Sequence, residues 1–199
     1  MKIILAKSAG FCFGVRRAVE LTEQTAAKVA ESGGAAKVFT FGELIHNRDV
    51  VNRLREAGIA PIEALNEAQC GDYVIIRSHG VPKKIYEELE TRGINFIDAT
   101  CPFVSNIHRI VSAAYERGEQ VFIVGNPEHP ETIGINGHCG NSAIFIRGEE
   151  ELRKLEGRSG CLVVQTTFDS ETFAAMQRVI EREYPRIRVF NSICSTTFE

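Results

Sequence analysis

Short apolar runs alternate with longer amphipathic stretches along most of the 199-residue chain. The apolar runs have the length of strands, and the stretches between them have the spacing of one-sided helices. We expect strands at 3–6, 38–41, 73–76, 95–97, 121–124, 143–146, 161–165 and 188–190, and helices at 15–32, 48–57, 83–91, 104–117 and 170–184. This order predicts an α/β fold of repeated αβ lobes with mainly parallel sheets. The Gly-, Asn- and Pro-rich segment 125–141 is expected to be a functional loop.

Composition excludes several classes of partner. The chain is 44% apolar and has a formal net charge of -3, so it has no general basic field that would favour nucleic acid or an anionic membrane. The first apolar stretch is too short for a signal peptide, and no apolar run reaches the length of about eighteen residues typical of a membrane helix. We therefore expect a cytoplasmic protein. In that compartment six cysteines indicate metal binding or catalysis more than disulfides.

Three of these cysteines, Cys12, Cys101 and Cys194, each follow a short apolar run and lie 89 and 93 residues apart. Residues at the carboxyl ends of strands can converge in an open α/β sheet, so these thiols could share one site. The glycines around Cys12 and the proline after Cys101 suit the start of a helix, where a thiolate is stabilised. Three thiolates can hold zinc with an open fourth position, or three irons of a 4Fe-4S cluster, and the spacing does not choose between them.

The near-equal separations suggest a repeated structural unit. We expect a first αβ lobe at 1–100, a second at 101–193 and the start of a third lobe at 194–199. The other cysteines are better explained as structural: Cys161 lies in an apolar run, and Cys70 and Cys139 lie beside glycines.

Histidines form a second candidate group, because His46, His79 and His129 each lie in or next to a predicted loop that follows an apolar run. Each alone is typical of a surface or capping histidine. Together, beside helix amino termini, they could hold a phosphate or diphosphate without a Walker-type glycine loop, which this sequence lacks. His108 and His138 have no comparable setting, and we interpret them as structural.

Two more polar residues could move a proton. Glu131 lies close to His129 in sequence, and a carboxylic acid in a closed pocket can keep a raised pKa and donate its proton. Thr166 ends an apolar run and could pass on a proton or hold a hydroxyl, although, taken alone, it is better explained as an ordinary strand-end or helix-cap threonine.

Together these residues resemble the 4-hydroxy-3-methylbut-2-enyl diphosphate reductase family, also called IspH or LytB. The resemblance covers seven short motifs in the order and approximate spacing of that family. They are Gly10-Phe11-Cys12-Phe13-Gly14-Val15, His46-Asn47-Arg48, Ser78-His79-Gly80-Val81, Asp98-Ala99-Thr100-Cys101-Pro102, His129-Pro130-Glu131, Gln165-Thr166-Thr167 and Ile193-Cys194.

The resemblance implies three αβ lobes around a central 4Fe-4S cluster, held by the residues that match the family's ligands, Cys12, Cys101 and Cys194, with the fourth iron open to substrate. The same resemblance implies that the substrate diphosphate contacts the histidines at 46 and 79. The residues at 129 and 166 lie near the reacting hydroxyl, and the glutamate at 131 is the proton source.

In the family, two electrons from ferredoxin or flavodoxin and two protons remove the hydroxyl as water. The products are isopentenyl and dimethylallyl diphosphate, and the reaction ends the non-mevalonate isoprenoid pathway.

The family continues well beyond Glu199 and supplies a Ser-x-Asn motif and a later serine to the diphosphate, so the sequence predicts a third lobe that is largely missing. Two alternatives to the enzyme follow. One is a catalytically inactive module of the same fold that binds an iron-sulfur cluster, zinc or an anionic metabolite. The other is an interaction protein whose cysteines are incidental.

Overall fold

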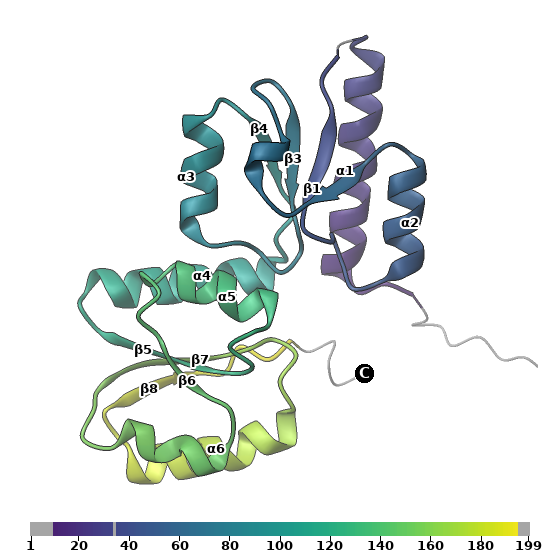
Figure 1. Cartoon of the computed structure of the whole chain (residues 1–199). Helices are drawn as coiled ribbons and strands as arrows, with labels where there is room; N and C mark the ends of the chain where they lie inside the picture. The colour runs from purple at the N-terminus through teal and green to yellow at the C-terminus, as the bar shows by residue number, and fades with distance from the viewer. Residues whose placement is uncertain (1–9, 34, 195–199) are drawn as a thin grey trace, which may run out of the picture.

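The computed structural model describes residues 10–33 and 35–194 and contains two four-stranded sheets, each with helices on both faces (Figure 1). Every strand pair is parallel, which confirms the predicted α/β class. The strand expected at 3–6 lies outside the described residues. Within the described ranges no helix is long and apolar enough to cross a membrane.

The first sheet has the strand order β2-β1-β3-β4. Its elements are α1 (Phe13–Glu31), β1 (Val38–Phe41), α2 (Arg48–Glu56), β2 (Ala60–Ile62), the 3-10 turn η1 (Leu65–Glu67), β3 (Tyr73–Ile76), α3 (Lys83–Thr91) and β4 (Asn95–Asp98). Successive side chains of a strand point to opposite faces. Helices α1 and α2 cover one face of this sheet and α3 covers the other (Figure 1). Ile75 accordingly packs in the core with residues of α1 and α2, whereas Val74 and Ile76 pack in the core with Leu89 of α3.

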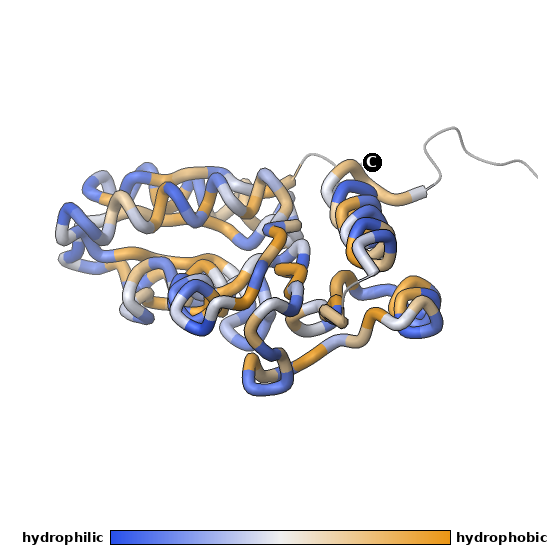
Figure 2. Tube along the Cα trace, turned by 90° about the horizontal axis from the view of Figure 1, so that it is seen from above, coloured by the Kyte–Doolittle hydropathy of each residue, from blue (hydrophilic) through white to orange (hydrophobic). Residues whose placement is uncertain are grey.

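The second sheet repeats this arrangement with the order β6-β5-β7-β8. Its elements are α4 (Pro102–Glu116), β5 (Gln120–Val124), α5 (Pro130–Gly137), β6 (Ile144–Ile146), η2 (Glu149–Leu155), β7 (Gly160–Val164), α6 (Ser170–Glu183) and β8 (Ile187–Phe190). Val121 and Ile123 pack towards α4 and α5, and Phe122 and Val124 pack towards α6. The helices alternate between hydrophilic and hydrophobic residues along their length, as expected for helices that bury one side (Figure 2).

The two sheets have the same strand order. Each is also preceded by a helix that begins directly after a cysteine, α1 after Cys12 and α4 after Cys101. In each sheet the first and third strands in sequence lie side by side at the centre. The predicted repeated unit is visible in this shared topology. The exact lobe boundaries at 100 and 193 stay a prediction.

One prediction was wrong, because the segment expected to be a loop at 125–141 contains helix α5. Pro130 suits the first helical position, and His129 caps the helix with its side chain. Gly134 and Gly137 lower the local helix propensity, but burial of Thr132, Gly134 and Ile135 compensates for that loss. The short strand β2 was also not predicted.

The three cysteines expected to be structural are not part of the site described below. Cys139 and Cys161 are fully buried, and burial raises the pKa of each thiol to about 11, so both remain protonated at neutral pH. Cys70 is exposed.

Candidate active site

The candidate residues lie just beyond the carboxyl ends of the central strands of both sheets. His46 follows β1 and His79 follows β3, while His129 follows β5 and Thr166 follows β7. In each sheet the connections that leave the two central strands run towards opposite edges. Such topological switch points are where open α/β sheets bind ligands. The two lobes therefore contribute equivalent positions to one region.

A cavity of about 140 Å³ lies in this region and is lined by residues from both lobes. Its walls include all three cysteines expected to bind metal, Cys12, Cys101 and Cys194, together with His79, Glu131 and Thr166. Six of the eight residues selected from the sequence thus line one cavity. The other two, His46 and His129, contact the ring of His79.

The thiol of Cys101 lies at the amino end of α4, where the backbone N–H groups of Phe103 and Val104 favour its thiolate form. Burial nevertheless raises the pKa of Cys101, and Coulomb repulsion from Cys194 and Cys12 raises it further. Three sulfurs grouped around one small cavity would repel one another as thiolates, so a cation bound between them would stabilise that form. This charge arrangement fits a metal centre.

The backbone around Cys12 is shaped to approach Cys101 closely. A Cβ atom added to Gly14, in the first turn of α1, would lie 2.6 Å from Cys101 Sγ. The third cysteine, Cys194, is held by the second lobe, because its backbone N–H donates to the carbonyl of Thr166 at 2.9 Å. Three sulfur donors from separate loops fit either zinc with an open position or three irons of an iron-sulfur cluster.

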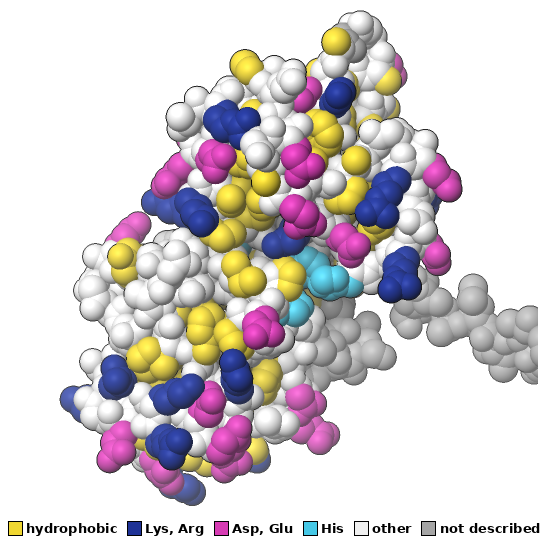
Figure 3. All heavy atoms as spheres, in the orientation of Figure 1, with side chains coloured by type: hydrophobic (Ala, Val, Ile, Leu, Met, Phe, Trp, Pro, Cys, Tyr) yellow, Lys and Arg dark blue, Asp and Glu magenta, His cyan; other side chains and the backbone are white. Residues whose placement is uncertain are grey.

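The rings of His46, His79 and His129 form a cluster at the junction of the lobes, where Figure 3 shows histidine side chains together on the surface. Their centroids are 4.5, 5.8 and 5.6 Å apart, and one nitrogen from each ring lies within 4.8 Å of the others. Burial lowers the pKa of His79 to about 3, aided by repulsion from the other two rings and from Arg77. His79 is therefore neutral at pH 7.

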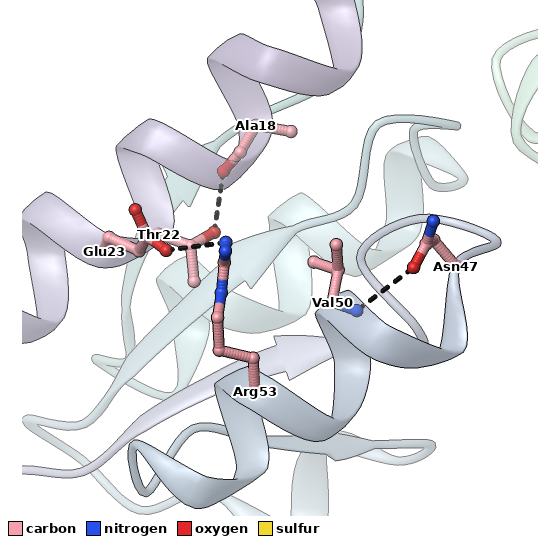
Figure 4. Close-up of polar contacts among 6 residues, drawn as sticks. All are labelled: Ala18, Thr22, Glu23, Asn47, Val50 and Arg53. Carbon is pink, nitrogen blue, oxygen red and sulfur yellow. Dashed lines mark hydrogen bonds and ion pairs between the residues drawn. The ribbon is translucent and has the colours of Figure 1, made fainter. Parts of the chain in front are cut away.

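The position of His46 is set by the start of α2. The side chain of the next residue, Asn47, caps this helix by accepting a hydrogen bond from the Val50 N–H at 3.1 Å (Figure 4). Further along α2, Arg53 pairs with Glu23 of α1 at 2.9 Å, which links the two helices (Figure 4). His46 thus lies beside a helix amino terminus, as predicted.

A hydrogen bond to His129 indicates which of two kinds of ligand, an anion or a metal ion, suits the histidine cluster. Its Nδ1 accepts the backbone N–H of Glu131 at 3.1 Å, so in the neutral ring the proton is on Nε2. A metal ion needs the lone pair of that nitrogen, whereas an anion needs the N–H donor. The histidine cluster is therefore better suited to an anion than to a metal.

Glu131 and Thr166 form a buried pair in the cavity wall. One carboxylate oxygen of Glu131 accepts the Thr166 backbone N–H at 2.7 Å, and the other lies 2.6 Å from the Thr166 hydroxyl. Glu131 is only 2% exposed, and this burial raises its pKa, although the two bonds from Thr166 partly oppose the rise. A buried acid with a raised pKa is suited to proton donation.

Arg77 is a charged residue of this region that the sequence analysis did not select. It follows β3 directly, its Nε is buried and makes no hydrogen bond to any residue that the structure describes, and its charge lowers the pKa of both His79 and His129. The available signal was an arginine directly after a fully apolar strand, two residues before a selected histidine. Its fixed positive charge adds to the anion-binding character of the cluster.

Comparison with known proteins supports the motif-based resemblance. A family model described as LytB protein matches residues 3–199. A 4-hydroxy-3-methylbut-2-enyl diphosphate reductase from Alkaliphilus oremlandii is 40% identical over 198 residues, which cover 99% of this chain and 69% of that protein.

Two solved structures have the same fold. One, of (E)-4-hydroxy-3-methyl-but-2-enyl diphosphate reductase, the terminal enzyme of the non-mevalonate pathway, has a TM-score of 0.84 and 40% identity over 98% of this chain and 69% of its own. The other, of the E-1-hydroxy-2-methyl-but-2-enyl-4-diphosphate reductase from Plasmodium falciparum, has a TM-score of 0.87 and 26% identity over 96% of this chain and 60% of its own. The chain therefore belongs to the LytB family, the oxidoreductases named 4-hydroxy-3-methylbut-2-enyl diphosphate reductase.

Proposed function

We propose that this chain catalyses the reductive dehydroxylation of (E)-4-hydroxy-3-methylbut-2-enyl diphosphate to isopentenyl and dimethylallyl diphosphate. One observation supports this reaction above all: a single cavity has three cysteine thiols and a buried acid with its threonine partner in its walls. The histidine cluster at the edge of that cavity supplies a separate place for the diphosphate.

Cys12, Cys101 and Cys194 are the proposed ligands of a 4Fe-4S cluster. When bound, such a cluster supplies single electrons and an open, Lewis-acidic iron for the substrate alcohol. Zinc would fit the same three donors but cannot change its oxidation state, so a reductase favours the iron-sulfur cluster. The electrons would come from a one-electron carrier such as ferredoxin or flavodoxin.

The diphosphate is proposed to bind at His46 and His79, as the resemblance implies, and also at His129, which the resemblance places near the reacting hydroxyl but whose ring contacts both others. A neutral imidazole can still donate one N–H to a phosphate oxygen, and the hydrogen bond that Glu131 donates to His129 Nδ1 leaves Nε2–H of that ring available. Hydrogen bonds to a charged acceptor are stronger than neutral ones. The nearby positive charge of Arg77 favours the same anion.

Glu131 is the proposed proton source for the leaving hydroxyl. The Thr166 hydroxyl contacts the Glu131 carboxyl, and both residues line the cavity, so Thr166 can relay the proton from Glu131 to the substrate oxygen. The C–O bond then breaks, and the oxygen leaves as water instead of hydroxide. Two electrons and two protons balance the reaction, and the second proton adds at either end of the allylic fragment to give the two products.

The direct test starts with purification of the full chain without oxygen. Iron and sulfide are counted, the visible and EPR spectra are recorded, and substrate is then added with a one-electron reductant. A brown protein with iron and sulfide in equal amounts that consumes substrate supports the proposal. A cluster without turnover supports the inactive binding module, and a colourless protein with zinc or no metal rejects the iron-sulfur assignment.

Gly14→Ala is expected to lower the iron and sulfide content of the anaerobically purified protein strongly. The added methyl group would lie 2.6 Å from Cys101 Sγ and force one of the two helix starts to move. Gly118→Ala is the control, because a Cβ there meets open space although its φ is +71°. The control should lose about 1 kcal/mol of stability and keep its cluster. Wild-type iron content in Gly14→Ala would contradict the proposed role of this close approach.

His46→Ala and His79→Ala are each expected to weaken the binding of pyrophosphate, measured by isothermal titration calorimetry. The expected loss is roughly tenfold to a hundredfold, as for other hydrogen bonds to a charged group. Arg109→Ala, which removes a full positive charge from an exposed part of α4, should bind pyrophosphate as the wild type does. Equal weakening in all three variants would indicate a nonspecific charge effect instead of a histidine site.

A further inference from the structure

Helix α5 lies at the junction of the two lobes, with its two ends in different surroundings (Figure 1). Its amino end contains two proposed site residues, because His129 is the N-cap and Glu131 is in the first turn. Its carboxyl end packs against residues 80–82 of the first lobe, which directly follow His79. One short helix therefore contacts both sides of the proposed substrate site.

The packing at the carboxyl end of α5 is backbone against backbone. A Cβ at Gly134 would lie 3.4 Å from both the Gly80 carbonyl carbon and the Val81 nitrogen, an ordinary contact. A Cβ at Gly137 would lie 2.6 Å from Pro82 Cα, which no real Cβ tolerates. The absence of a side chain at Gly137 thus sets how closely the first lobe approaches α5.

A directional hydrogen bond fixes the same contact. His138, the C-cap of α5, has its Nε2 3.1 Å from the carbonyl oxygen of Val81. A carbonyl can only accept, so Nε2 is the protonated nitrogen of this ring. The ring also stacks on that of His108 from α4, with centroids 4.0 Å apart and an interplanar angle of 19°. His108 is 6% exposed and lies against Gly80.

We propose that His138 is a positioning residue, which, with Gly137 and the stacked ring of His108, holds residues 80–82 against α5 and so sets the distance between His79 and the His129–Glu131 end of the helix. The rings of His79 and His129 are 5.6 Å apart, and they come from different lobes. The two rings can share one anion only if the lobes keep this separation. This proposal depends on the proposed diphosphate site only where pyrophosphate binding is the quantity measured.

The test compares His138→Phe with His138→Gln in the anaerobically purified, cluster-loaded full chain. Phenylalanine keeps an aromatic ring for stacking but removes the N–H donor, whereas glutamine can place an amide N–H near the position of Nε2. We expect His138→Phe to weaken pyrophosphate binding about tenfold, because small displacements of positioned groups have effects of this size or larger. His138→Gln should return to within about threefold of the wild type, and kcat should change less than KM in both.

Ser112→Ala is the matched control, because Ser112 donates to the carbonyl of His138 itself at 3.2 Å, within the second lobe. It should affect unfolding temperature without affecting pyrophosphate binding. Gly137→Ala, which displaces Pro82, should weaken binding in the same direction as His138→Phe. Wild-type affinity in His138→Phe, or equal losses in the phenylalanine and glutamine variants, would overturn the proposal.

Hydrogen-deuterium exchange supplies a readout that does not depend on any ligand. The backbone amides at 79–81 should exchange faster in His138→Phe than in the wild type, and His138→Gln should reverse the change. Unchanged exchange would overturn the positioning role whatever the binding result. If the wild type itself fails to bind pyrophosphate, the proposed diphosphate site fails, while the exchange experiment still decides the role of His138.

Discussion

Replacement of Glu131 with glutamine is expected to lower turnover at least a hundredfold, the usual size of a lost general acid, while iron and sulfide content stay at the wild-type level. Glutamine has nearly the same shape and can still accept the Thr166 N–H, which is 2.7 Å from a carboxylate oxygen in the wild type. It has no acidic proton to deliver. Turnover with substrate and a one-electron reductant, measured beside the EPR spectrum, separates loss of the proton source from loss of the cluster.

Glu128→Gln is the matched control, because Glu128 is an exposed glutamate three residues earlier in the chain. It should retain full activity. Thr166→Ser should also retain activity since it keeps the relaying hydroxyl, whereas Thr166→Val should resemble Glu131→Gln. Unchanged turnover in Glu131→Gln would remove Glu131 as the proton source.

The pH dependence supplies a second check on Glu131. Burial raises the pKa of this carboxyl, so its acid form persists at higher pH than that of an exposed glutamate. Wild-type turnover should fall as pH rises through this raised pKa, because the donor loses its proton. The glutamine variant has no such proton, and its residual activity should lack this decline.

Most of the fold could be predicted from the sequence because each lobe is built from local patterns. The runs at 38–41, 73–76 and 83–91 coincide with β1, β3 and α3, since their apolar spacing matches the side-chain period of the element they form. Helix α5 could not be predicted in this way. Two of its eight residues are glycines, and its stability comes from burial against both lobes, which no local pattern reports.

Most of the candidate site, like most of the fold, could be predicted from the sequence. The strand-end rule selected residues at the central strands of both sheets, and it therefore selected His46, His79 and His129 without any knowledge of distances. The rule could not select His138, whose contact with Val81 spans 57 residues and joins two lobes. It also gave no information on tautomers. The sequence already suggested an anion at the histidines, but the argument against a metal there needed the hydrogen bond that the Glu131 N–H donates to His129 Nδ1.

Cys101→Ser is expected to remove most of the iron and sulfide from the purified protein and to abolish turnover with it. Cys101 is the central thiol of the proposed site: it lies at the amino end of α4, next to Gly14, and interacts electrostatically with Cys12 and Cys194. Serine is almost isosteric with cysteine, but its hydroxyl is a much poorer ligand for iron than a thiolate. The variant should therefore fold and remain colourless.

Two other cysteines make this experiment specific. Cys70→Ser changes an exposed thiol, and Cys161→Ser changes a fully buried one that faces the core of the second sheet. The first should have no effect, and the second should lower stability by about 1–3 kcal/mol because it buries a hydroxyl, yet keep its iron. Iron loss in Cys161→Ser as well would mean that the cluster responds to general destabilisation. Full iron in Cys101→Ser would exclude this thiol as a ligand, and without it Cys12 and Cys194 could not hold a three-cysteine cluster.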